Sequence, residues 1–558
     1  MNPRLSMLLP LILGGILAAL LLLLLPRDWT AGWDLGNDMK SGMPPVGPPK
    51  SAPERVTNPE PDPAADFAGA QKWADAAARI RALLERRLGG KHARENEALL
   101  SFKTNEAYQK FLARAAAAGL KVIDQLDGFR TVRVGYDDPD AIQRDLLANA
   151  ADYDGVAANY SAYHPSTPVR EDRAAQQEVG FGDNVLAFLG VTGGNSQWGK
   201  GVTIAVLDSG VAGDATFGTT GRVRYLNIGQ GLLGTGEGDG HGTAVAALAA
   251  GQSPDAMGVA PGAEILSIKV TGEDGTSDLF TLAKGIRMAA DSGAQVINIS
   301  LGAYENSAIL TQAITYAMAR GSLIVAPSGN DQAATMTWPA ADTRVVSVGA
   351  IDAVEQQASF SNSGEGLKMT APGYGINTAW LNGERVVFDG TSGSAPIVAG
   401  AVAAMMSENP GLTANQAWEV LQQYSSDGGA PGADNAYGSG ILNLGWAMNR
   451  NDPVRVDTAV SSHYYNNLTG QMEFVIQNRS GTAVSSMELF ITDNMAQNAY
   501  TIPFLNPGAS TIIALPVNQL ELTRSQSGLA YRSQLMNPAG TRDVIPANNQ
   551  KASTVFKR

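Results

Sequence analysis

The clearest indication of the fold class is the stretch Gly201-Val-Thr-Ile-Ala-Val-Leu-Asp208-Ser-Gly210. Its apolar run is continuous and not alternating, which is typical of a strand buried on both faces of a parallel sheet. The strand ends abruptly in an acid, and ligands and catalytic groups gather at the carboxyl ends of such strands. Asp208 is therefore a candidate functional residue, although an isolated acid at a strand end is more often structural.

Strands and helices alternate on both sides of this stretch. The segments predicted to be regular are strands at 202–207, 264–269, 296–300 and 323–326, and helices at 242–250, 279–292 and 308–320. Apolar strands rich in Val and Ile, separated by helical runs, predict a parallel sheet covered by helices on both faces. We expect this α/β domain to occupy residues 184–450.

A second candidate is His241, in Gly-His241-Gly-Thr at the expected start of a helix of small residues. The flanking glycines let other backbone come close. The chain has four histidines, and the other three lie outside residues 184–450: His92, His164 and His463. If the α/β domain performs His-assisted nucleophilic chemistry, His241 is its base.

The third candidate is Ser392, in Asp389-Gly-Thr-Ser392-Gly-Ser-Ala-Pro396. The segment runs from a turn into an apolar helix, and Pro396 is tolerated only near a helix start. A serine there meets free backbone N–H groups that can stabilise an oxyanion. The plainer interpretation is an N-cap serine. Ser394 is a rival nucleophile that the register of the helix start disfavours.

Together these motifs resemble the subtilisin family of serine proteases, in which Asp, His and Ser follow one another in this chain order. The resemblance implies a serine endopeptidase that forms an acyl-enzyme. Ser392 would attack the peptide carbonyl, His241 would transfer the proton, and Asp208 would orient the imidazole. One departure is Gly393, where the family commonly has Met, and we expect it to loosen the pocket wall.

Two further segments carry the same resemblance. Val-Ile-Asn-Ile-Ser300-Leu-Gly302 resembles the strand that lines the substrate, and Pro-Ser-Gly-Asn330 resembles the turn that supplies an oxyanion donor. The resemblance implies that Asn330 is catalytic and that a substrate adds as an extra strand. The substrate-binding residues implied are Ser300, Leu301, Gly302, Ser328 and Gly329. No cofactor or metal is required; family members often bind calcium, but no ligand-rich loop here compels it.

Residues 95–165 are predicted to form strand, helix, two strands, helix and strand, an order typical of a ferredoxin-like domain. The resemblance implies that this is a prodomain that chaperones and inhibits the protease; an independent binding or spacer domain is the alternative. An amphipathic helix within residues 67–94 precedes it. We expect its C-terminal tail in the active-site cleft, and a self-made cut within residues 166–179 of the linker 166–183.

The two ends of the chain differ in character. Residues 1–27 contain an apolar run, 8–25, close to the ~20 residues that span a bilayer. We expect a single-pass signal-anchor with the catalytic domain outside the cytoplasm and a released form after processing; a cleaved signal peptide is the alternative. We expect residues 28–66, which are rich in Pro and Gly, to form a disordered tether. Residues 451–558 alternate in polarity, which predicts an all-β sandwich.

Composition limits the partners. The chain has no Cys, which excludes disulfides and a thiolate nucleophile. Its formal net charge of -13 disfavours a nucleic acid as partner. We expect protein or peptide substrates; the sequence does not fix the oligomeric state. A catalytically inactive, membrane-tethered binding protein remains the alternative. A G-x-G-x-x-G match at 229–234 is discounted because no helix is expected directly after it.

Overall fold

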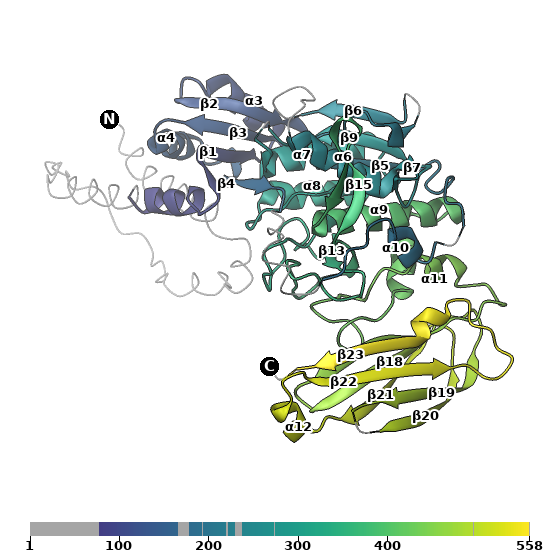
Figure 1. The fold of residues 1–558 in the computed structure, drawn as a ribbon. Coiled ribbons are helices and arrows are strands. Elements are labelled where there is room, and N and C mark those ends of the chain that lie inside the picture. Colours follow the sequence, from purple (N-terminus) through teal and green to yellow (C-terminus); the bar gives the residue numbers. More distant parts are fainter. Residues whose placement is uncertain are drawn as a thin grey trace, which may run out of the picture. The chain divides into compact units, whose positions relative to one another are not determined.

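The computed structural model describes residues 78–556 apart from 166–177, 192, 219–220, 229–236, 273 and 495. The chain divides into two compact units, Met1–Tyr160 and Ser161–Arg558 (Figure 1). The predicted anchor and tether lie outside the described residues. Within the part of the chain that the structure describes, no helix is both long and apolar enough to cross a bilayer.

The first unit contains the predicted βαββαβ order. Its elements are β1 (Ala93–Phe102), α3 (Asn105–Arg114), β2 (Leu120–Leu126), β3 (Thr131–Tyr136), α4 (Pro139–Asn149) and β4 (Tyr153–Tyr163), whose last three residues belong to the second unit. The sheet is antiparallel with strand order β4-β1-β3-β2. Residues 78–88 are helical and bury Ile80 and Leu84 in the core of this unit.

The second unit is built on a seven-stranded parallel sheet with the order β14-β13-β12-β11-β5-β9-β6. Its strands are β5 (Thr203–Asp208), β6 (Val223–Asn227), β9 (Glu264–Lys269), β11 (Val296–Ile299), β12 (Leu323–Pro327), β13 (Val346–Ile351) and β14 (Met369–Pro372). β5 lies between β11 and β9, and all six of its residues are buried. The continuous apolar run around residue 205 therefore forms a fully buried strand, as predicted.

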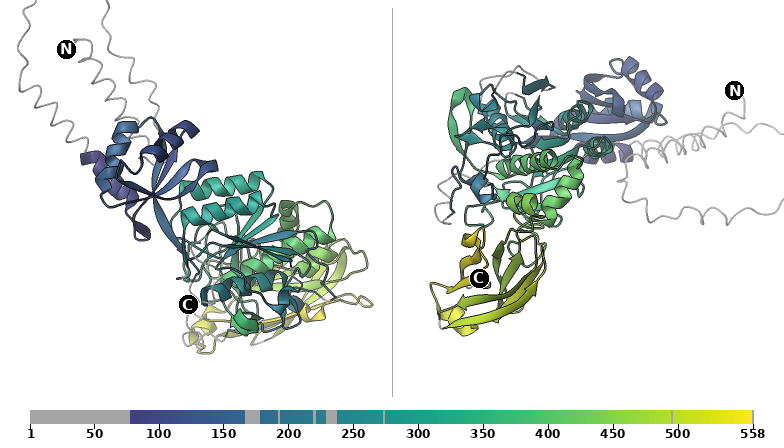
Figure 2. Two further views of the ribbon diagram at one scale, coloured as in Figure 1. Left: turned by 90° about the horizontal axis from the view of Figure 1, so that it is seen from above. Right: turned by 90° about the vertical axis from the view of Figure 1, so that its right-hand side faces the viewer.

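Helices cover both faces of this sheet (Figure 2). α6 (Glu237–Ala250) and α9 (Thr391–Glu408) pack on the face that includes Val206, and they share its apolar core. α7 (Leu279–Asp291) and α8 (Ala308–Ala319) cover the other face, where a Cβ on Gly285 would lie 3.1 Å from Leu207 Cδ2. The layered α/β arrangement that the sequence predicts is thus present.

The start of α6 differs from the prediction. The helix begins at Glu237 and not at Gly242, so His241 lies inside it. Glycine is a poor helix former, which is why the sequence indicated a later start. The helix nevertheless begins within a glycine-rich run, because its packing on the sheet overrides local propensity. The G-x-G-x-x-G match lies outside the described residues.

Seven strands near the C-terminus form two antiparallel sheets, β17-β18-β21 and β20-β19-β22-β23. They are β17 (Thr458–Asn466), β18 (Gln471–Asn478), β19 (Val484–Thr492), β20 (Gln497–Leu505), β21 (Ser510–Pro516), β22 (Leu529–Met536) and β23 (Gln550–Val555). Phe474 of one sheet and Leu489 of the other lie in the same buried cluster. His463 is held between Ser533 Oγ at 2.7 Å and Ser553 Oγ at 2.8 Å, which indicates a structural role.

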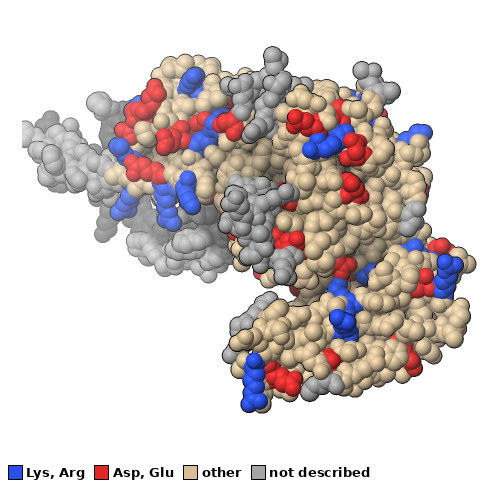
Figure 3. All heavy atoms as spheres, in the orientation of Figure 1, with Lys and Arg blue, Asp and Glu red and all other residues tan. Residues whose placement is uncertain are grey.

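Short elements complete the second unit. They are α5 (Val185–Phe188), β7 (Gln252–Ser253), β8 (Ala256–Met257), β10 (Thr276–Asp278), β15 (Ile376–Ala379), β16 (Arg385–Phe388), α10 (Ala414–Gln423), α11 (Leu444–Asn449) and α12 (Gln519–Arg524). On the face drawn in Figure 3, the described acidic and basic side chains are interspersed.

Candidate functional site

Asp208 ends strand β5 and is completely buried. Its Oδ1 accepts a hydrogen bond from the Ser209 backbone N–H at 2.7 Å and lies 2.8 Å from His241 Nδ1. Burial acts to raise the pKa of Asp208, but the adjacent imidazoles of His241 and His164 outweigh it, and the pKa is held below its usual range. Asp208 is therefore a carboxylate aimed at His241.

The glycines around His241 are required by close backbone contacts. A Cβ on Gly242 would lie 2.2 Å from the carbonyl oxygen of Gly210, and a Cβ on Gly240 would lie 2.2 Å from the Trp380 ring. Real side chains do not approach so closely, so only glycine lets α6 lie against the end of β5. The glycines thus let other backbone come close, as the sequence predicts, and the imidazole of His241 lies beside Asp208.

Ser392 lies in the first turn of α9 and is buried. Its backbone carbonyl accepts a hydrogen bond from Ser300 Oγ at 3.4 Å. Its own hydroxyl has no hydrogen-bond partner among the residues that the structure describes. The structure thus joins Asp208 to His241 by a hydrogen bond but does not join His241 to Ser392; such catalytic bonds often tighten only in the substrate complex.

The rival serine has a structural role. Ser394 is fully buried, and its Oγ donates to the carbonyl oxygens of Ala371 at 3.2 Å and Pro372 at 3.0 Å. The adjacent Gly393 leaves room for an aromatic ring, because a Cβ there would lie 3.1 Å from Phe388 Cδ1. The Phe388 ring centroid is 5.3 Å from that of His241. The Phe388 ring therefore occupies the space beside Gly393 that a side chain at position 393 would take.

Asn330 has its amide oriented by its neighbour. Asn330 Oδ1 accepts from the Thr391 backbone N–H at 3.0 Å and from Thr391 Oγ1 at 2.7 Å. The amide nitrogen is therefore directed away from Thr391, and it donates to the carbonyl oxygen of Pro165 at 3.0 Å. An oriented amide that binds a peptide carbonyl is the arrangement expected of an oxyanion donor.

Residues 161–165, which we call the tail segment, pair through Tyr163 with Gly302, which follows β11. Tyr163 N–H donates to Gly302 O at 3.0 Å, and Gly302 N–H donates to Tyr163 O at 2.9 Å. On the other side, residues 161–163 pair antiparallel with β10, with Tyr163 opposite Thr276. The tail segment is thus held as an added strand, which is the way a substrate was expected to bind.

The remaining predicted substrate-binding residues have different surroundings. Ser300 and Leu301 are completely buried. Ser328 Oγ donates to the carbonyl oxygen of Asn362 at 3.0 Å, and the backbone N–H of Gly329 donates to Thr391 Oγ1 at 3.3 Å. Of the predicted set, Gly302 is the residue whose backbone pairs with the tail segment. The hydrogen bonds of Ser300, Ser328 and Gly329 connect them to neighbouring segments of the same unit.

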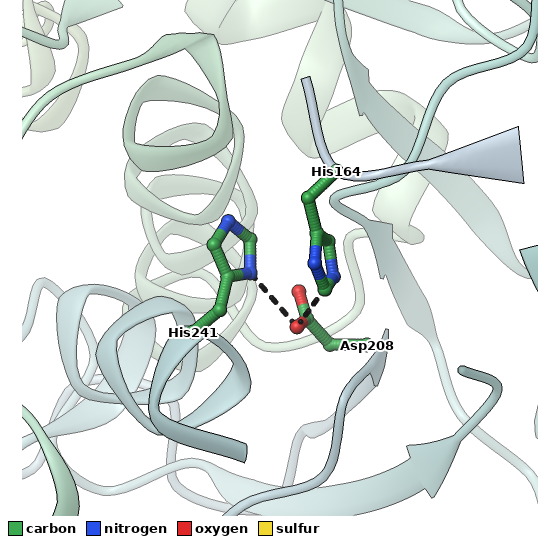
Figure 4. A group of neighbouring side chains, drawn as sticks. All are labelled: His164, Asp208 and His241. Carbon is green, nitrogen blue, oxygen red and sulfur yellow. Dashed lines mark hydrogen bonds and ion pairs between the residues drawn. The ribbon is translucent and has the colours of Figure 1, made fainter. Parts of the chain in front are cut away.

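His164 belongs to the site and was missed by the sequence reasoning. Its ring stacks on that of His241, with centroids 3.9 Å apart and an interplanar angle of 23° (Figure 4). Its Nε2 lies 3.1 Å from Asp208 Oδ1. Its position in the sequence could have indicated this role. A histidine at the end of a tail that is predicted to lie in the cleft is expected to lie near Asp208 and His241.

The group His164, Asp208 and His241 also has the composition of a metal site, with ligand atoms within 4.8 Å of one another. A metal would need each nitrogen lone pair, which lies in the ring plane, to converge on one ion at about 2.0 Å. Rings stacked face to face do not converge in this way. Asp208 Oδ1 is, moreover, already hydrogen-bonded to the Ser209 N–H and to His241 Nδ1, so the geometry does not favour a metal ion.

Comparisons with known proteins bear on residues around this site. A model of the subtilase family matches residues 199–440. Subtilisin BL from Lederbergia lenta is 37% identical over 247 residues, which cover 44% of this chain and 90% of that protein. Subtilisin Savinase from the same organism is 36% identical over 247 residues, with the same coverage of both chains.

A similar fold occurs among solved structures. The crystal structure of the epidermin leader peptide processing serine protease from Staphylococcus aureus has a TM-score of 0.52 and 21% sequence identity to this chain. The match covers 63% of this chain and 97% of the other. At this identity it shows likeness of fold alone.

Proposed function

The chain belongs to the subtilase family and is a serine-type endopeptidase, and on that basis we propose that it hydrolyses peptide bonds of proteins through Asp208, His241 and Ser392. One observation carries the proposal: the carbonyl oxygen of Pro165 accepts a hydrogen bond from Asn330. Asn330 is in turn hydrogen-bonded to Thr391, the first residue of the helix that holds Ser392. A peptide carbonyl is thus bound by the residue that we propose as the oxyanion donor.

In the proposed reaction, Ser392 Oγ attacks the scissile carbonyl carbon and His241 accepts the hydroxyl proton. His241 later donates that proton to the leaving amine, and water then hydrolyses the acyl-enzyme. Asp208 holds the imidazole in one tautomer through the 2.8 Å contact to Nδ1. The pKa of Asp208, which lies below its usual range, supports its role as the charged member that stabilises the imidazolium.

The oxyanion would be held by Asn330 Nδ2 together with the Ser392 backbone N–H at the start of α9. Thr391 supports this role, since its two hydrogen bonds to Asn330 Oδ1 leave Nδ2 free to donate. A donor fixed before reaction costs no reorganisation in the transition state.

We further propose that residues 95–165 act as an inhibitory prodomain and that the enzyme cuts its own chain. The tail segment supports this, because Tyr163 pairs with Gly302 and the carbonyl oxygen of Pro165 accepts from Asn330. We therefore propose the cut after Pro165. A cut there lies immediately before residues 166–179, the stretch in which the sequence predicted it. The product would retain residues 161–165 in the cleft until the prodomain is lost.

Localisation is likewise a proposal. The apolar run at residues 8–25 would anchor the chain in a membrane with the catalytic domain outside the cytoplasm. Cleavage after Pro165 would then separate the anchor from residues 166–558, so the released fragment would carry the catalytic residues. We propose no cofactor for the reaction, and structural calcium remains open to a test by chelation.

The experiment compares the full chain with Ser392→Ala and with Ser394→Ala as a matched control. Intact mass and N-terminal sequencing would be measured after expression, alongside digestion of an unfolded protein substrate. We expect wild type and Ser394→Ala to digest the substrate and to yield a chain that begins at Ser166. Ser392→Ala should do neither. Retained digestion by Ser392→Ala would contradict the proposal.

A further inference from the structure

The β15–β16 hairpin packs against α6, the helix that carries His241. Phe388, the last residue of β16, has its ring centroid 5.3 Å from that of His241. Thr378 of β15 donates from Oγ1 to the carbonyl oxygen of Ala244 in α6 at 3.3 Å. A displacement of the hairpin would therefore change the surroundings of the proposed base.

At the other end of β16, the guanidinium of Arg385 contacts two carboxylates from different parts of the chain. Nη1 lies 3.2 Å from Asp214 Oδ2, and Nε lies 2.9 Å from Asp255 Oδ2. Nη1 also donates to the carbonyl oxygens of Gly383 and Glu384, at 3.3 and 3.0 Å. Because these carbonyls belong to its own hairpin, the two ion pairs connect the hairpin to both acids.

The two acids follow segments that carry members of the proposed triad. Asp214 comes after β5, which ends at Asp208. Asp255 lies in the turn between β7 and β8, which follows α6. β16 itself precedes α9, the helix that carries Ser392. The side chain of Arg385 thus joins the three segments that bring the proposed catalytic residues together.

The two ion pairs differ in burial. The side chain of Asp214 is 1% exposed and that of Arg385 is 25% exposed, whereas that of Asp255 is 62% exposed. Exposed ion pairs contribute little to stability, because water and salt screen their charges. Loss of the guanidinium would, in contrast, leave the buried Asp214 carboxylate without this cation, which is strongly unfavourable. The pair with Asp214 is therefore expected to contribute most of the constraint on the hairpin.

We propose that Arg385 is a positioning residue: its guanidinium fixes the β15–β16 hairpin relative to β5 and α6, and thereby fixes the position of the His241 imidazole. This inference rests on the proposed function of the same site. Arg385 acts through His241 and not on the substrate. Its removal therefore lowers kcat, whereas peptide pairing along Gly302, and with it KM, changes little.

The test uses the full chain and compares Arg385→Met with Arg344→Met. Arg344 is the matched control, because it also forms an ion pair with a largely buried carboxylate, that of Asp342, just before β13. Arg385→Lys keeps a cation on the hairpin. A fluorophosphonate counts the active sites in each preparation, so that kcat per site and KM can be measured on an unfolded protein substrate. Thermal unfolding reports the stability of each variant.

We expect Arg385→Met to lower kcat per site by about 10- to 100-fold, since a displacement of about 1 Å at a catalytic group has an effect of this order. KM should change little, Arg385→Lys should retain more of kcat than Arg385→Met, and Arg344→Met should keep the wild-type kcat.

Three results would overturn the inference and leave the proposed function intact: equal kcat per site in Arg385→Met and Arg344→Met, equal kcat in Arg385→Met and Arg385→Lys, or a loss confined to the number of active sites. A wild-type chain that does not digest the substrate would overturn both.

Discussion

Asn330 Nδ2 donates a 3.0 Å hydrogen bond to the carbonyl oxygen of Pro165. The contact joins residues that are 165 positions apart in the chain. It also identifies Asn330 as a donor to a peptide carbonyl and not to a side chain. Its consequence for catalysis can be measured directly.

Asn330→Ala should lower kcat with little change in KM. The donor is expected to act mainly when negative charge develops on the carbonyl oxygen, so the transition state loses more than the bound substrate. Loss of one oxyanion-hole donor lowers kcat by about 10²- to 10³-fold in subtilisin, and we carry that magnitude over to this chain. Steady-state kinetics on one peptide substrate give both constants. A change confined to KM would identify Asn330 as a binding residue.

Ser392→Ala and His241→Ala should each abolish peptidase activity without unfolding the chain. The two side chains act as one unit, and in subtilisin the loss of either lowers kcat by about 10⁶-fold. Ser394→Ala is the matched control, since Ser394 Oγ donates to the carbonyls of Ala371 and Pro372. Thermal unfolding checks the fold of each variant. Activity in Ser392→Ala with loss of activity in Ser394→Ala would reverse the assignment.

Gly242→Ala should lower activity by displacing His241 from Asp208. The added methyl would lie 2.2 Å from the carbonyl oxygen of Gly210, so α6 must shift from the end of β5. A shift of about 1 Å at a catalytic group can cost about 10²-fold in rate. Gly213→Ala is the control, because a Cβ there meets nothing within 4 Å. Equal activity of the two variants would show that the glycine is not needed for the close contact.

The sequence predicts the parts of this structure that follow from local pattern and from motifs. The buried strand ending at Asp208, the alternation of strands and helices and the βαββαβ order all follow from apolar periodicity. The sequence does not predict the start of α6 at Glu237, because packing on the sheet overrides the low helix propensity of glycine.

Long-range contacts account for the residues that sequence reasoning missed. His164 precedes Asp208 by more than forty positions, and nothing in its local sequence shows that its ring will stack on His241. Phe388 is likewise apolar and unremarkable in sequence, yet it lies beside both Gly393 and His241. His164 is placed by the pairing of the tail segment with Gly302, and Phe388 is placed by the fold around α9.

Docking of the tail sequence should weaken as the pH falls. Burial, followed by the charge of His241, lowers the pKa of His164 in the cleft, while Asp208 acts in the opposite direction. A docked pKa below the free-peptide value of about 6.5 means that the histidine contact is fully present above that pH and is lost below it. The inhibition constant of Ser-Ala-Tyr-His-Pro should therefore rise between about pH 7.5 and pH 5.5.

The matched peptide with Phe in place of His separates this effect from titration of the enzyme. Its inhibition constant should change less over the same range, because it has no imidazole to protonate. The same pH dependence for both peptides would assign the titration to the enzyme and would exclude His164 as its source.

Ser392 is the nucleophile in the proposed reaction, and chemical labelling tests this role directly. A fluorophosphonate reacts covalently with an activated serine, so peptide mapping of the labelled enzyme, done on a preparation that cleaves a peptide substrate, identifies that serine directly. We predict one adduct, on Ser392, that is absent from Ser392→Ala and strongly reduced in His241→Ala. An adduct on Ser394, or an active preparation with no adduct on Ser392, would contradict the account.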